Sequence, residues 1–226
     1  FRWVCMSERP EDLAKSDEIA VNILKKELET APEEIQGQLN DNIHWIEEAG
    51  RNHLVVGSQA RILYADCEGR TKIALAFNGA IRKGEISAPI VLGRDHHDVS
   101  GTDSPFRETS NIKDGSNVMA DMAVQCFAGN CARGMSLVAL HNGGGVGIGK
   151  AVNGGFGMVC DGSERVDEIL RSAMLWDVMG GVARRSWARN AHAMETSEEF
   201  NRTHAEGYHI TMPYVADEEL IDKYIK

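Results

Sequence analysis

The spacing of apolar residues predicts two helices near the start of the chain. Pro10 suits the first turn of the first helix, and Thr30 and Glu33 have the spacing of a capping box that begins the second. Gly50 is placed to end the second helix. We therefore predict a helical hairpin over 10–50. The apolar residues that recur at about helical spacing are Ile19, Val21, Leu24, Leu28, Ile35, Leu39, Ile43 and Ile46.

Short apolar runs alternate with helical stretches over 58–226, which we take as the α/β part of the chain. The expected strands are 60–64, 90–92, 137–140 and 156–160, with 208–212 as a candidate closing strand. The expected helices are 70–83, 117–133, 163–179 and one that Thr196 caps. Repeated strand–helix units are typical of a mainly parallel sheet with flanking helices, so we predict one α/β domain with the hairpin as an N-terminal appendage.

The composition of the chain argues against nucleic-acid-binding and membrane-spanning proteins. A chain of 226 residues, 42% of them hydrophobic, is long enough to bury a core. The formal net charge of −10 argues against a nucleic-acid partner, because phosphate binding needs a basic face. No run approaches the ~20 apolar residues of a membrane-spanning helix. The five cysteines are odd in number and have no scaffold-like spacing, so we expect reduced thiols and a cytoplasmic protein.

A dense group of ionisable residues, 94–98, follows the expected strand at 90–92. In an open α/β sheet ligands bind beyond the carboxyl ends of strands, so this group is a candidate site. Asp95 and His96 suit proton transfer, because a carboxylate can hold a neighbouring imidazole in one tautomer. Two alternatives stay open. His96 and His97 could bind a metal together with His141, or the loop could be a purely structural, hydrogen-bonded one.

Arg107 follows a rigid proline and a bulky aromatic residue in Ser104-Pro105-Phe106-Arg107. An arginine held in this way suits bidentate binding of a carboxylate or phosphate. A local ion pair with Glu108 explains the same residue equally well.

A glycine-rich run, 143–149, follows the expected strand at 137–140. Such a run lets a ligand approach the backbone and leaves N–H groups available to an anion. It is not a clean dinucleotide fingerprint, and a tight structural turn is the competing interpretation.

These motifs together closely resemble the urocanase family. The resemblance rests on Arg94-Asp95-His96-His97-Asp98 through Thr109 and on His141-Asn142-Gly143-Gly144-Gly145, and it is supported in order by Phe1-Arg2-Trp3-Val4, Ala60-Arg61-Ile62 and Asp161-Gly162. It covers nearly the whole chain and is closest to the longer form of animals and protists. It implies that residues 1–226 are the C-terminal part of the urocanase core domain, with the NAD-binding Rossmann domain expected upstream and absent here. The abrupt start without methionine fits that expectation.

The resemblance also implies a function. Urocanases add water to urocanate to give imidazolone propionate in histidine catabolism, with NAD⁺ as an electrophile, and the family suggests a homodimer. By position, Arg2 and Arg107 resemble the arginines that hold the substrate carboxylate, and Asp95 resembles the acid/base, with His96 as its partner. Gly143, Gly144 and Gly145 resemble the glycines that contact NAD⁺.

One departure from the family concerns a thiol. Bacterial members carry a cysteine directly after Ala-Arg-Ile, where this chain has Leu63. Cys67 lies between Asp66 and Glu68, whose charges are expected to raise its pKa, so it does not inherit that role. Three other functions stay open: a catalytically idle interaction domain of the same fold, a hydratase for a substituted urocanate, and the metal hydrolase built on the histidines.

Overall fold

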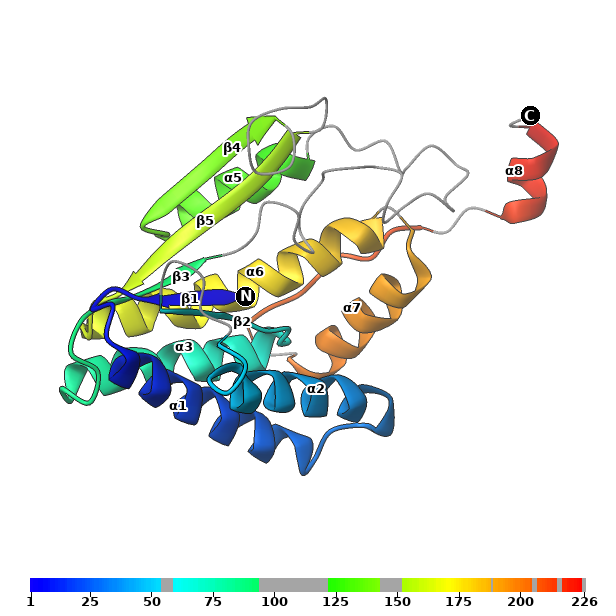
Figure 1. Cartoon of the computed structure of the whole chain (residues 1–226). Helices are drawn as coiled ribbons and strands as arrows, with labels where there is room; N and C mark the ends of the chain where they lie inside the picture. Colours follow the sequence, from blue (N-terminus) through cyan, green and yellow to red (C-terminus); the bar gives the residue numbers. More distant parts are fainter. Residues whose placement is uncertain are drawn as a thin grey trace. The chain divides into compact units, whose positions relative to one another are not determined.

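A computed structural model describes residues 1–53, 59–93, 122–142, 152–187, 189–204, 207–214 and 217–224 (Figure 1). The chain divides into two compact units. The first unit comprises Phe1–Asp95, Ala132–Val138 and Phe156–Leu175, and the second comprises His96–Cys131, Ala139–Gly155 and Trp176–Lys226. None of the helices in the described ranges is long and apolar enough to cross a membrane.

Helices α1, Pro10–Leu28, and α2, Glu33–Ala49, confirm the two helices expected near the start of the chain. Pro10 occupies the first turn of α1 as predicted. The capping box predicted for α2 is wrong, since Pro32 is the N-cap residue and no side chain caps the helix. The Thr30 hydroxyl instead donates to the carbonyl of Glu27 in α1, at 3.4 Å.

The strands form a five-stranded sheet in the order β2-β1-β3-β5-β4. Strand β1 pairs antiparallel with both β2 and β3, and β3 pairs antiparallel with β5. The predicted mainly parallel sheet is therefore wrong, although the mixed α/β class is correct. The strands are β1 Arg2–Cys5, β2 Ala60–Ile62, β3 Ile90–Gly93, β4 Leu137–Asn142 and β5 Val152–Cys160.

The physical reason lies in the position of β1. The unit β2–α3–β3 has the strand–helix–strand order that normally gives two parallel neighbours. Its two strands do run parallel, because each is antiparallel to β1, but β1 lies between them and takes the hydrogen bonds of both. Local apolar patterns show that strands exist, but they do not show which strands are neighbours.

Helix α3, Cys67–Arg82, supplies much of the contact with the sheet. The Asp66 side chain caps it by accepting from the N–H of Gly69, at 2.7 Å. Phe77 is fully buried, and it lies beside Trp3 of β1, with ring centroids 5.3 Å apart. Gly84 follows the C-cap residue of this helix in the left-handed conformation, with φ +74°, which is typical of the residue after a helix end.

The two faces of the sheet in the first unit differ in burial. Helices α1 and α3 and the first half of α6 cover one face (Figure 1). The residues that point into this core are almost fully buried: Phe1, Trp3, Cys5, Arg61, Leu63, Ile90, Leu92, Met158 and Cys160. The other face, which we call the outer face, carries Arg2, Val4, Ala60, Ile62, Val91 and Gly93, all at least partly exposed. This alternation follows from the two-residue repeat of a strand.

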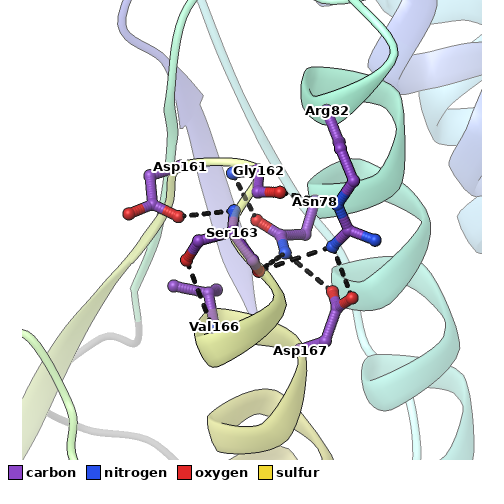
Figure 2. A network of polar contacts seen from close by, with 7 residues as sticks. All are labelled: Asn78, Arg82, Asp161, Gly162, Ser163, Val166 and Asp167. Carbon is purple, nitrogen blue, oxygen red and sulfur yellow. Dashed lines mark hydrogen bonds and ion pairs between the residues drawn. The ribbon is translucent and has the colours of Figure 1, made fainter.

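A polar network fixes the turn that leads from β5 into α6, Glu164–Trp187 (Figure 2). The fully buried Asn78 side chain accepts from the N–H of Gly162 at 2.7 Å and donates to the Ser163 carbonyl at 2.9 Å and to an Asp167 carboxylate oxygen at 2.7 Å. Arg82 donates to the Gly162 carbonyl at 2.6 Å and forms an ion pair with Asp167. Burial acts to raise the pKa of Asp167, but the hydrogen bonds from Asn78 and Arg82 outweigh it and lower that pKa.

The second unit contains α5, Met122–Ala132, the second half of α6, α7, Ala191–Thr203, and α8, Glu218–Tyr224. Helix α7 begins earlier than predicted, because Asn190 rather than Thr196 caps it, accepting from the N–H of Ala193. The candidate strand at 208–212 is absent from the described residues. The Asn201 side chain makes two hydrogen bonds to the backbone of Ile210, at 2.7 and 2.8 Å, and so replaces a strand partner there.

The network around Asn78 predicts a large loss of stability on its removal. Asn78→Ala leaves the N–H of Gly162 and the carboxylate of Asp167 without their buried partner, so we expect the free energy of unfolding to fall by roughly 2–4 kcal/mol. Urea denaturation of the full-length protein measures this change. Asn52→Ala is the control, because Asn52 makes one exposed hydrogen bond to Glu48, and a change within about 0.5 kcal/mol is expected. Equal effects for the two variants would contradict the prediction.

Candidate functional site

Arg2 is the predicted site residue that the structure describes. It lies at the start of β1, directly opposite Ile62 of β2 and Gly93 of β3. Directly opposed residues of antiparallel strands share a face, so Arg2 belongs to the outer face and not to the helix-covered core. Gly93 precedes Arg94 and Asp95 along the chain. The register therefore places Arg2 beside Gly93, the residue that precedes the ionisable group in the sequence, although 90 residues lie between Arg2 and Gly93 in the chain.

The other predicted site residues lie outside the described ranges. These are Asp95 and His96, the substrate arginine Arg107, and the glycines Gly143, Gly144 and Gly145. Their roles stay predictions.

Gly93 is a residue of this site for which the sequence predicts no role of its own. Its position shows only in the strand register, where it opposes Arg2 on one side and Gly157 on the other. The signal in the sequence was slight: a glycine at the end of an apolar run, directly before the ionisable group.

Arg61, from the Ala60-Arg61-Ile62 motif, points to the core side of the sheet. Its guanidinium donates from Nε and Nη2 to one carboxylate oxygen of Asp17 in α1, at 3.2 and 2.9 Å. The Arg61 side chain is only 4% exposed. Burial raises the pKa of Asp17 to about 6, even though the charge of Arg61 acts to lower it. Arg61 therefore ties α1 to β2 and does not share the outer face with Arg2.

Neither position 63 nor Cys67 supplies a nucleophilic thiolate. Leu63, at the position of the bacterial cysteine, is buried in the core. Burial raises the pKa of Cys67 to about 11, and the charges of Asp66 and Glu68 add to the rise. The predicted direction is confirmed, although burial rather than the acids is the main cause. Cys131, and not Cys67, is the exposed thiol.

Metal binding finds no support among the described residues. They contain no group of three or more histidine, cysteine, aspartate or glutamate side chains that could hold an ion. His96 and His97 of the metal alternative lie outside the described ranges. Cys126 is buried and accepts a hydrogen bond from Asn130 at 3.7 Å, which fits a core cysteine.

The burial of the thiols predicts a difference in reactivity. At pH 8 only about one Cys67 side chain in a thousand is ionised if its pKa is near 11. We expect iodoacetamide to modify the exposed Cys131 at pH 8 and to modify Cys67 efficiently only above about pH 10. Peptide mapping by mass spectrometry after timed labelling measures both rates in one sample. Equal labelling of the two cysteines at pH 8 would contradict the interpretation of Cys67 as an unreactive thiol.

Comparison with known proteins identifies the family. The family model described as the urocanase C-terminal domain matches residues 1–199. The chain is 52% identical to urocanate hydratase of Mus musculus, covering 100% of this chain and 34% of that relative. It is 54% identical to the probable urocanate hydratase of Caenorhabditis elegans, covering 99% and 33%.

Human urocanate hydratase is 57% identical over 86% of this chain and 29% of its own length. The chain thus spans about a third of the length of the curated relatives it matches. The family model covers most of the chain, and the resemblance seen in the motifs is confirmed. The chain belongs to the urocanase C-terminal domain family.

Proposed function

We propose that this chain is the C-terminal part of a urocanate hydratase, which adds water to urocanate to give imidazolone propionate. The observation that carries the proposal is the register of β1 against β3, which puts Arg2 opposite Gly93, the residue two positions before Asp95 in the sequence. The family assignment and the names of the relatives in mouse and human support the same reaction.

The proposed roles follow from the chemistry of the substrate. Urocanate carries a carboxylate and an imidazole ring, so it needs a bidentate cationic donor at one end and a proton donor or acceptor at the other. Arg2 and Arg107 would hold the carboxylate. Asp95, assisted by His96, would move protons at the imidazole. Fixing the carboxylate at the outer face orients the ring, which lowers the entropic part of the barrier.

The proposed cofactor is NAD⁺, which when bound supplies an electrophile. Gly143, Gly144 and Gly145 would contact it. The described turn at the start of α6 does not fit its phosphates, because the N–H groups of Gly162 and Ser163 already donate to Asn78 and Asp161. As the family resemblance implies, we propose that the remainder of the subunit supplies most of the cofactor contacts.

The proposal extends to the setting of the protein. We infer a homodimer in the cytoplasm, acting in histidine catabolism, as the family resemblance implies. The five free cysteines, of which three are buried, are in keeping with a reducing compartment.

The activity itself is the first test. The full-length protein that contains this chain is expected to consume urocanate, seen as loss of its ultraviolet absorbance in the presence of NAD⁺. A catalytically idle domain would leave the absorbance unchanged, and an enzyme for a substituted urocanate would prefer the ring-substituted compound in the same assay. Either result would contradict the proposed function.

Arg2 provides a more specific test. Arg2→Lys keeps the charge but loses the two-pronged contact with a carboxylate, so kcat/KM for urocanate should fall roughly 10- to 100-fold. Arg9→Lys is a matched control, because Arg9 is an exposed arginine whose contact with Glu11 spans 3.5 Å at the surface. Steady-state kinetics of both variants measure the effect. An unchanged kcat/KM in Arg2→Lys would show that Arg2 does not bind the substrate carboxylate.

A further inference from the structure

Gly93 lies in a strand, and its backbone conformation does not require a glycine. Its φ lies outside the left-handed region, unlike that of Gly84 or Gly162. Within β3 the ladder is regular from Ile90 to its last residue, Gly93, which lies opposite Arg2 in β1 and opposite Gly157 in β5, so no bulge inside the strand explains the glycine. A glycine inside a strand weakens the strand and often marks a place where another group approaches closely.

The group that approaches Gly93 is the side chain of Arg2. A Cβ atom added at Gly93 would lie 3.9 Å from Cγ of Arg2 and 3.8 Å from the carbonyl oxygen of Phe156. These are ordinary contact distances, so a single methyl group fits. The two further methyl groups of valine would extend beyond that Cβ, and they would meet the stem of the arginine.

The neighbouring Gly157 has a different surrounding. A Cβ atom there would lie 3.4 Å from Cβ of Leu137, and Gly157 is buried. Packing against β4 therefore accounts for Gly157. At Gly93, the side chain within 4 Å of an added Cβ is that of Arg2, among the residues that the structure describes.

We propose that Gly93 is a positioning residue for Arg2: the absence of a side chain at Gly93 lets the arginine lie along β3 and hold a substrate carboxylate. This inference rests on the proposed function, because it takes Arg2 as the carboxylate-binding residue. A branched side chain at this position would displace the guanidinium and weaken the binding of the carboxylate, without removing any group that takes part in proton transfer.

A graded series of variants of the full-length enzyme tests the inference. Gly93→Ala should keep KM for urocanate within about threefold, because one methyl group fits. Gly93→Val should raise KM about 10- to 100-fold, while kcat changes much less. The melting temperature of Gly93→Ala should be unchanged or higher, because alanine costs a strand less than glycine does.

The matched control is Ala60→Val. Ala60 lies on the same outer face, in β2 opposite Val4, one row away from Arg2. The substitution adds a branched side chain to the same sheet, and it should leave KM within about twofold. If Gly93→Val shows no cooperative thermal unfolding, and so does not fold, Gly93→Ser replaces it in the test. Serine adds one hydroxyl group to the alanine side chain, so Gly93→Ser should raise KM more than Gly93→Ala.

A double-mutant cycle separates positioning from a general structural effect. In the Arg2→Ala background, Gly93→Val should change KM less than about twofold, because no guanidinium is left to displace. An effect of the same size in both backgrounds, or an unchanged KM in Gly93→Val alone, would overturn the inference. Failure of the proposed function looks different, since the unaltered enzyme would then not consume urocanate.

Discussion

The alternation of side chains along β1 is the constraint on which the first unit depends. Trp3 and Cys5 must point into the core, because they pack against α1 and α3 and are at most 1% exposed. A strand repeats every two residues, so Arg2 and Val4 must then point to the outer face. The register with Gly93 follows from the same pairing. A slip of one residue would bury the arginine and expose the tryptophan, so core packing itself holds Arg2 in place.

Two glycines of this unit serve different purposes. Gly162 is required by its conformation, with φ +87°, and by its surroundings, since a Cβ atom there would lie 3.0 Å from the backbone nitrogen of Arg82. At Gly93 neither the backbone conformation nor a steric clash requires a glycine, and the missing side chain leaves space beside Arg2. The network of Asn78 holds Gly162 at the carboxyl end of β5. Because β5 and β3 are antiparallel, that turn and Gly93 lie at opposite ends of the two strands. The Asn78 network, which stabilises the fold, and the proposed substrate contact of Arg2 thus lie at different ends of these strands.

Partly buried asparagines explain two places where local patterns misled the sequence-based predictions. Asn201 binds the backbone of Ile210 and so replaces the strand expected at 208–212. Asn190 caps α7 well before Thr196, the residue with the expected capping spacing. In both cases a side-chain amide satisfies backbone groups, and sequence patterns alone do not reveal which of several candidates will do so.

The sequence by itself determined most of the elements and the family. Helical spacing of apolar residues located α1, α2 and α3, and short apolar runs located β2 to β5, because each pattern reflects a local repeat. The motifs around Asp95 and Gly144 indicated the urocanase family, which the family model confirms. Only the tertiary structure decided that β1 lies between β2 and β3, that the sheet is antiparallel there, and that Gly93 faces Arg2. Strand neighbours and shared faces depend on contacts between residues far apart in the chain, and no local repeat records those contacts.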